Sequence, residues 1–344
     1  MKKAATIIFA LFASVALQAQ LRNQEVYEMT EYDNTNLRRE VSIPNIPGFE
    51  TLKCDFHIHT VFSDGLVWPS VRINEAWQQG LDAIAITDHI EYRPHKEVLS
   101  GDLNESFKIA KKTAEEIGFL VIPGTEITRS KPLGHLNALF IENAIPMDVE
   151  DPLMAIDEAK KQGAFVMWNH PGWPDDKATL YPVHEQLIKE KKINGIEVFN
   201  YLEYYPVAFD WCHQFNLAFM ANSDIHNTVN NEYGAKIRPM TLVFARERSV
   251  EGIKEALFDN RSVALFDGVL AGQAEHLKAL VLASLQVRKA TGTLLEVTNK
   301  SDIPFQATCD GKLYLFPARQ TTRMNMPASD TMTLLNCHTG METR

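Results

Sequence analysis

The chain has 344 residues, of which 45% are hydrophobic and 23% are charged, and its formal net charge is −10. This length and composition are those of a globular protein with one large and one small domain, or two medium ones. An acidic chain is repelled by phosphate backbones, so we expect no nucleic-acid polymer as a partner. Four cysteines are too few for a disulfide scaffold, although Cys309 and Cys337 share a late segment and leave one bridge open.

Residues 1–20 have the pattern of a secretory signal peptide. Lys2 and Lys3 precede the apolar run at 4–17, and the small residue Ala19 closes the stretch. A membrane anchor is the alternative, but the run is short for a span. We therefore expect cleavage of this segment, no stable membrane span afterwards, and an exported protein that is periplasmic or extracellular.

Residues 21–49 are polar and predict a lead-in segment that is ordered in part. From residue 50, short apolar runs alternate with amphipathic stretches, which favours a parallel sheet of crossover units. The apolar runs lie at 53–57, 83–87, 119–123, 136–141, 165–168, 196–199 and 217–221. The expected helices lie at 69–79, 104–117, 151–162, 209–214 and 250–258. Seven runs predict a closed or nearly closed α/β barrel over residues 50–272, with an open doubly wound sheet as the alternative.

The composition changes after residue 272. Residues 275–344 are rich in Thr, Val and Leu, and we expect them to form a small C-terminal all-β domain without a long helix. Within it, residues 305–316 are interrupted by Asp310 and Gly311, which predicts a hairpin.

Residues that can bind metal ions gather at the ends of the apolar runs. His57 and His59 alternate at the end of the first run, so their side chains leave the strand in one direction. The other candidates at or near run ends are Asp64, His89, Glu126, His135, His170, Asp224 and His226. Such mixed imidazole and carboxylate ligands suit Mn²⁺, Zn²⁺ or Fe²⁺. Because nine ligands exceed the four to six that one ion binds, we expect two or three divalent metal ions per chain.

The order of these motifs is HxH, SDG, TDH, GxE, H, NHP and DxH over residues 52–260, and it resembles the PHP (polymerase and histidinol phosphatase) family. Members of that family are metal-dependent phosphoesterases with a distorted seven-stranded, TIM-like (β/α) barrel. The resemblance implies three ligand sets. The first is His57, His59, Glu126 and Asp224, the second is Glu126, His135 and His170, and the third is Asp64, His89 and His226.

Together, the resemblance and the donor types favour hydrolysis of a small-molecule phosphate ester, either a phosphodiester or a phosphomonoester, by metal-bound hydroxide at a dinuclear or trinuclear site. We expect Glu126, Asp224 and His226 to be catalytic. Two alternatives stay open. One is a metal-dependent amide or lactone hydrolase, and the other is a non-catalytic exported metal-binding protein.

Three arginines follow the ligand motifs and are candidate substrate contacts. Arg93, Arg129 and Arg238 each offer a cation to phosphate, with a solvated surface charge as the alternative. Asp88 is expected to orient its neighbours rather than to bind metal. The sequence leaves open whether Trp68, Trp168 and Trp173, which flank ligand positions, line a pocket for an organic leaving group or belong to the core.

Overall fold

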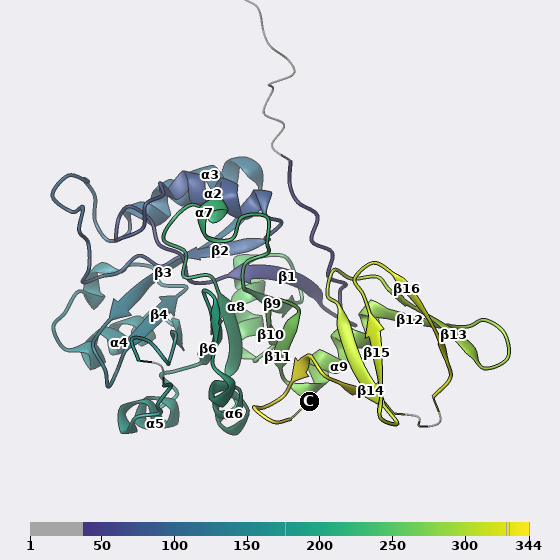
Figure 1. Ribbon diagram of the computed structural model, residues 1–344. Helices are drawn as coiled ribbons and strands as arrows, with labels where there is room; N and C mark the ends of the chain where they lie inside the picture. The colour runs from purple at the N-terminus through teal and green to yellow at the C-terminus, as the bar shows by residue number, and fades with distance from the viewer. Residues whose placement is uncertain (1–36, 176, 328, 330, 344) are drawn as a thin grey trace, which may run out of the picture. The chain divides into compact units, whose positions relative to one another are not determined.

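The computed structural model describes residues 37–175, 177–327, 329 and 331–343 (Figure 1). The predicted signal peptide at 1–20 lies outside the described residues. Among the residues described, no helix is both long and apolar enough to cross a bilayer. The end of the predicted lead-in segment is part of the core, because Val41, Ile43 and Ile46 are buried.

All five predicted helical stretches are helices, and local signals mark their ends. Asp151 accepts a hydrogen bond from the Leu153 backbone N–H before α4, and Gly118 ends α3 with a φ of 65°. Figure 1 shows α2 and α3 side by side. The helices of the described part are α2 (Pro69–Gln78), α3 (Glu105–Ile117), α4 (Pro152–Lys161), α5 (Pro182–Lys189), α6 (Pro206–Phe215), α7 (Val229–Glu232), α8 (Val250–Phe258) and α9 (Ala274–Ser284), with a 3₁₀ turn η2 (Ile145–Met147).

One large, mixed sheet organises the described chain. Its path runs β18-β11-β10-β9-β1-β2-β3-β4-β5-β6-β7, and β8 pairs with β6. The strands are β1 (Glu50–Asp55), β2 (Ala83–Ile86), β3 (Leu120–Thr128), β4 (His135–Leu139), β5 (Phe165–Trp168), β6 (Gly195–Asn200), β7 (Glu203–Tyr204), β8 (Ala218–Asn222), β9 (Met240–Ala245), β10 (Ser262–Phe266), β11 (Val269–Gly272) and β18 (Cys337–His338).

The predicted count of seven strands is wrong, since this sheet has twelve. The short connection between β3 and β4 cannot hold a crossover, so these strands run antiparallel, as do β9, β10 and β11. The sheet curls until β8 lies beside β9 and β10, where Thr241 Oγ1 donates to the Ala221 carbonyl and Ser262 Oγ donates to the Phe219 carbonyl, both at 3.0 Å. In the described backbone ladders β8 pairs only with β6, so these ladders do not close a TIM-like barrel.

The C-terminal part contains two three-stranded antiparallel sheets. One has the order β12-β13-β16 and the other β15-β14-β17. The expectation of no long helix from residue 275 is wrong, because α9 precedes them. The predicted hairpin is confirmed: β14 and β15 join through Asp310 and Gly311, whose φ angles are 49° and 73°. The strands are β12 (Leu285–Lys289), β13 (Leu294–Asn299), β14 (Phe305–Cys309), β15 (Lys312–Phe316), β16 (Thr321–Asn325) and β17 (Thr333–Leu334).

The C-terminal sheets share a hydrophobic cluster with the large sheet. Ile303 and Phe305 belong to the same cluster of buried side chains as Leu242 and Phe244 of β9. β18 also returns to the large sheet and pairs with β11. All four cysteines, including Cys309 and Cys337, are buried free thiols.

Candidate metal centre

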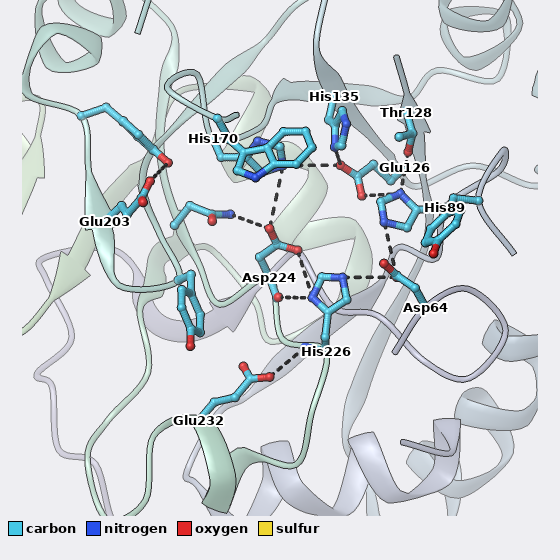
Figure 2. Close-up of a pocket in the computed structure, with 15 residues that line it drawn as sticks. Asp64, His89, Glu126, Thr128, His135, His170, Glu203, Asp224, His226 and Glu232 are labelled. Carbon is cyan, nitrogen blue, oxygen red and sulfur yellow. Dashed lines mark hydrogen bonds and ion pairs between the residues drawn. The ribbon is translucent and has the colours of Figure 1, made fainter. Parts of the chain in front are cut away.

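The predicted ligands lie where strands end, at one edge of the large sheet. The ligands that follow parallel strands lie just after the carboxyl ends of those strands. β4 runs antiparallel to β3, so its first residue, His135, lies at the same edge. Figure 2 shows most of the set pointing toward one another around a cavity. The structure brings together all nine predicted ligands: His57, His59, Asp64, His89, Glu126, His135, His170, Asp224 and His226.

Two carboxylates occupy the centre of the cluster. Asp224 Oδ1 lies 3.1 Å from His57 Nε2 and 3.0 Å from His59 Nε2. Glu126 Oε2 lies 3.3 Å from His57 Nε2, while its other oxygen, Oε1, lies 2.9 Å from His135 Nδ1. The two oxygens of Glu126 therefore face different imidazoles, so this one carboxylate would contribute an oxygen to each of two ligand sets.

A second group forms around Asp64. Its Oδ1 atom lies 3.2 Å from His226 Nε2, 3.4 Å from His89 Nε2 and 3.8 Å from His59 Nδ1. His59 thus stands between two groups, one around Asp64 and one around Asp224. The potential ligand atoms within each of three groups lie within 4.8 Å of one another: His59, Asp64, His89 and His226; His57, Glu126 and His170; and His57, His59 and Asp224.

Several buried atoms of this cluster lack the hydrogen bonds that buried polar atoms normally make. Among the described residues, His59 Nε2, Asp64 Oδ1 and His135 Nδ1 have no hydrogen-bond partner, although each lies near an oppositely charged or ionisable group. Divalent cations would satisfy all three, since these nitrogen and oxygen donors are of the types that Mn²⁺, Zn²⁺ and Fe²⁺ accept. The residues present therefore fit bound metal ions.

The electrostatics of the cluster keep its carboxylates charged. Burial opposes ionisation of Glu126, but His89 and His57 outweigh burial and hold the pKa of that carboxyl well below its usual range. Burial also opposes ionisation of Asp224, and its imidazole neighbours again lower the pKa well below the usual value. Against the effect of burial, Asp64 and Asp224 raise the pKa of His226 to about 9. Protons and metal ions accordingly compete for the same nitrogens.

A buried carboxylate outside the predicted set orients two of the ligands. Glu197, with 0% exposure, lies in β6 and its Oε1 atom is 2.9 Å from His57 Nδ1. Its Oε2 atom accepts the His170 backbone N–H at 2.8 Å. With the Nδ1 proton donated to Glu197, His57 presents its Nε2 lone pair to the centre. Sequence reasoning missed Glu197, although a single acidic residue inside the apolar run at 196–199 was a signal.

Two further residues hold the loops that carry ligands. Asp88 accepts hydrogen bonds from the Thr60 N–H and from Ser63 Oγ, both at 2.7 Å, before the turn that carries Asp64, which is the orienting contact expected of it. Arg72, which is 1% exposed, donates to the carbonyls of His59 at 2.9 Å and His226 at 2.8 Å. Arg72 was not predicted, because an arginine within an amphipathic helix usually indicates a solvated face.

Comparison with known proteins places this arrangement in a family. The PHP domain matches residues 55–299, which is most of the chain. The chain belongs to the PHP family. A two-domain protein from Bacteroides vulgatus, solved as containing a predicted PHP-like metal-dependent phosphoesterase, is 37% identical to this PHP protein. That match covers 89% of this chain and 96% of the other, with a TM-score of 0.85.

Two uncharacterised proteins of Methanocaldococcus jannaschii are also similar to this PHP protein. One is 30% identical over 160 residues, a match that covers 43% of this chain and 82% of the relative. The other is 37% identical over 83 residues, a match that covers 24% of this chain and 36% of the relative.

The three arginines considered as substrate contacts do not line the main cavity of the PHP site. Arg238 is 2% exposed and binds Asp55 at 3.0 Å. Arg129 pairs with Glu91 and donates to the carbonyls of Thr128 and Val149. Arg93 borders a much smaller hollow beside His89 and lies 3.9 Å from Asp148.

The main cavity has a volume of about 660 Å³ and opens above the PHP ligand cluster. This volume is typical of a site for a small organic molecule. Of the three tryptophans in question, Trp173 is a lining residue, Trp168 is buried in the core, and Trp68 does not line this cavity. Apart from the ligands, the lining consists of aromatic, hydroxyl, amide and carboxyl side chains: Tyr92, Thr128, Trp173, Asn200, Tyr201, Glu203, Tyr205 and Glu232.

Proposed function

We propose that this chain is a metal-dependent phosphoric ester hydrolase that acts on a small-molecule phosphodiester or phosphomonoester. The observation that carries the proposal is the convergence of three overlapping ligand groups, which contain Asp64, Glu126 and Asp224 in turn. Several buried ligand atoms in them have no hydrogen-bond partner within the described part of the chain. The Bacteroides vulgatus relative, described as containing a PHP-like metal-dependent phosphoesterase, supports the same chemistry.

The nine clustered residues are proposed to hold two or three divalent ions. His57, His59, Glu126 and Asp224 would form one set. Glu126 would share a second set with His135 and His170, and the third would contain Asp64, His89 and His226. When bound, such ions activate water for attack and offset negative charge on phosphate oxygens. Glu126 would bridge two sets, because its two oxygens face different histidines.

The remaining tasks in the proposed reaction belong to the chain itself. Glu197 fixes the ring of His57 and the backbone of His170, so it sets the direction from which both donors face the centre. Asp224 and Glu126 keep their negative charge against burial, which offsets the charge of the bound cations. The cavity above the cluster then receives the organic part of the ester.

The test combines metal analysis with hydrolysis of two model esters. Purified protein without residues 1–20 is stripped with chelator, reloaded with Mn²⁺ or Zn²⁺, and assayed with p-nitrophenyl phosphate and bis-p-nitrophenyl phosphate. We expect two or three metal ions per chain and chelator-sensitive release of nitrophenol. The preferred ester decides between the monoesterase and the diesterase.

Variants connect the activity to the site. His57→Ala and Asp224→Ala should each lose metal and reduce kcat/KM by at least about a hundredfold, because each removes a donor that faces the centre. His213→Ala and Asp148→Ala, on exposed side chains, are the matched controls. Full metal content with hydrolysis of amides or lactones but not of phosphate esters would replace this proposal with the carbonyl hydrolase.

Export is a separate part of the proposal. The basic residues and apolar run of residues 1–20 support cleavage and release into the periplasm or the medium. Expression of the full chain in a bacterial host, followed by fractionation and N-terminal sequencing, tests it. A mature protein that still begins at Met1 in the cytoplasm would contradict export.

A further inference from the structure

Apart from the histidines of the ligand cluster, the described residues that line the main cavity include carboxylates but no lysine or arginine. Two of these carboxylates, Glu203 and Glu232, lie outside the ligand cluster, on β7 and at the end of α7. Figure 2 shows them apart from each other on the side of the cavity away from Thr128 and His89. A phosphate held at the metal centre would therefore have its organic part facing carboxylate oxygens.

Glu232 has an oxygen that requires a hydrogen-bond donor. Its Oε1 atom accepts the backbone N–H groups of Asn227 at 2.6 Å and His226 at 3.3 Å. Its Oε2 atom is buried and has no partner among the described residues. A buried acceptor without a donor is costly. A small turn of the Glu232 side chain toward the cavity would let this oxygen accept a hydroxyl or N–H of a bound molecule.

Glu203 supplies a second acceptor at another point of the wall. One of its oxygens accepts the Tyr205 hydroxyl at 2.8 Å, and the side chain is otherwise exposed at the cavity. The two carboxylates come from different elements and lie apart in Figure 2, so a single donor group does not engage both. A molecule that carries several separated hydroxyl groups can do so.

Two cations near the cavity, Arg129 and Lys131, are held by other partners and are not available to a second anionic group on the ligand. Arg129 is bound by Glu91 and by two backbone carbonyls. Lys131 donates to Asp175 at 2.8 Å and to the Gly172 carbonyl at 3.1 Å. A bisphosphate or a nucleic acid would bring extra negative charge toward Glu203 and Glu232 without a compensating cation in the cavity wall.

Aromatic side chains provide the apolar contacts. Tyr92, Trp173 and Tyr201 line the cavity, and they are 55%, 53% and 40% exposed. Their ring faces can pack against the C–H faces of a ligand ring. The N–H₂ group of Asn200 donates to Glu197 at 2.8 Å and to Asp224 at 3.4 Å, so among the described lining residues no amide N–H₂ is free to donate to the edge of a nucleobase.

We propose that the alcohol part of the substrate is a neutral, polyhydroxylated ring of monosaccharide size. Glu203 and Glu232 accept its hydroxyl protons, and the aromatic side chains pack against its apolar faces. This inference rests on the proposed phosphoesterase activity, and it narrows the substrate class of the same site.

The experiment compares the phosphate esters of four different alcohols as substrates of the metal-loaded protein without residues 1–20. Glucose 6-phosphate, fructose 1,6-bisphosphate, adenosine 5′-monophosphate and phosphoethanolamine are assayed for phosphate release. If the assay with the two nitrophenyl esters shows that the protein is a diesterase, each of the four substrates is replaced by its p-nitrophenyl phosphodiester. We expect kcat/KM for the glucose ester to exceed each of the others by at least about tenfold. A higher value for any of the other three overturns the inference.

A variant assigns the preference to the cavity wall. Glu203→Ala should lower the ratio of kcat/KM for the glucose ester to that for the p-nitrophenyl ester by about tenfold, the loss expected from one charge-assisted hydrogen bond. Glu185→Ala, on the exposed face of α5, is the matched control and should leave the ratio unchanged. An unchanged ratio in Glu203→Ala contradicts the assignment.

A binding measurement separates this inference from the proposed function. Methyl glucoside, which has no phosphate, is titrated into the chelator-stripped protein while tryptophan fluorescence is recorded. We expect a saturable change in the millimolar range that is absent in Trp173→Phe, because Trp173 lines the cavity. If no phosphate ester is hydrolysed, the proposed function fails, and this titration alone decides the inference.

Discussion

The two ring nitrogens of His57 have separate tasks. Nδ1 lies 2.9 Å from Glu197 Oε1, whereas Nε2 lies 3.1 Å from Asp224 Oδ1. Both partners are carboxylates, and the charge of Asp224 and Glu197 outweighs burial and raises the pKa of His57 well above its usual value. A metal ion at the centre would displace the proton from Nε2 but leave the one that Glu197 holds at Nδ1.

Replacement of Glu197 by Gln tests this orienting role. Glu197→Gln replaces one carboxylate oxygen with an amide N–H₂. This group would face either His57 and Asn222 or Asn200 and the His170 N–H, all of which donate in the wild type, so we expect metal affinity to fall by about 10 to 100-fold. Activity should recover at higher metal concentration, because the nine predicted ligand residues are unchanged in this variant. Metal titration by calorimetry measures the affinity, and Glu185→Gln is the exposed control. Wild-type affinity in Glu197→Gln would contradict the role.

At this scale, sequence reasoning identified the residues at strand ends but not those behind them. His57, Asp224 and the other ligands stand out because each follows or begins an apolar run. Glu197 sits in the middle of such a run and Arg72 in an amphipathic helix, where a sequence does not show which side chain turns inward. Their roles depend on partners that are distant in the sequence. His57 and Glu197, for example, are 140 positions apart and meet only in the folded chain.

At the scale of elements, α2 links the two loops that carry His59 and His226. The guanidinium of Arg72 reaches the carbonyls of His59, Ile225, His226 and Asn227. These carbonyls belong to segments far apart in the sequence. One side chain of α2 therefore sets the distance between two ligand segments, and the metal centre depends on the position of this helix.

Arg72→Met should destabilise both the fold and the centre. Loss of the guanidinium leaves several buried carbonyls without donors, so we expect the free energy of unfolding to fall by about 3 to 5 kcal/mol. Arg72→Lys, which keeps the charge but reaches fewer carbonyls, should lose less and remain soluble if the Met variant does not fold. Urea unfolding and metal titration measure both effects, with the exposed Arg288→Met as control. Wild-type values for Arg72→Lys in both measurements would contradict the role of α2.

The first turn of helix α5 contains a buried histidine, His184, whose hydrogen bonds require the neutral ring. His184 Nδ1 accepts the Tyr181 backbone N–H at 3.2 Å, and Nε2–H donates to the Leu133 carbonyl at 2.7 Å. Its ring stacks on Trp168 with centroids 3.8 Å apart. Burial lowers the pKa of His184 from 6.5 to about 4. The hydrogen bond to Nδ1 also favours the neutral ring, because a second proton on Nδ1 would face the Tyr181 N–H.

This histidine predicts a loss of stability in acid. Below pH 6.5 the unfolded chain binds a proton at His184, whereas the folded protein binds it only near pH 4, so stability is complete above pH 6.5 and falls as the pH approaches 4. Between about pH 7.5 and about pH 5 the loss from this group is about 2 kcal/mol. His184→Asn should remove that part of the pH dependence, measured by urea unfolding at both pH values. Equal losses in the two proteins would contradict it, because the metal-site histidines are common to both.

The sequence predicted five of the described helices, and its seven apolar runs correspond to β1 to β6 and β8. It did not predict α5, α7 or α9, the later strands of the large sheet, or the directions of the strands. Apolar runs such as 136–141 look the same whether a strand runs parallel or antiparallel. The decisive feature was the short connection before His135, which forces β4 to reverse and brings that histidine to the ligand edge. The helix α9 was missed because its first residues adjoin a Thr- and Val-rich segment that dominates the composition after residue 275.

At the scale of the whole molecule, the C-terminal sheets and the large sheet share one cluster of buried side chains. Phe305 of β14 is 1% exposed and belongs to the same cluster as Leu242 and Phe244. The backbone also connects them, because the Leu270 N–H donates to the Asn336 carbonyl at 2.8 Å. Shared burial of this kind couples the unfolding of the two parts.

Phe305→Ala should therefore destabilise the metal centre as well as the C-terminal sheets. We expect a single unfolding transition whose free energy falls by about 3 to 5 kcal/mol, because a large buried ring is replaced by a cavity. Leu313→Ala, at a side chain that is 58% exposed, should change it by less than about 0.5 kcal/mol. Urea unfolding is followed both by circular dichroism and by release of bound Mn²⁺. Two separate transitions, with metal release unaffected by Phe305→Ala, would show that the C-terminal sheets unfold independently of the centre.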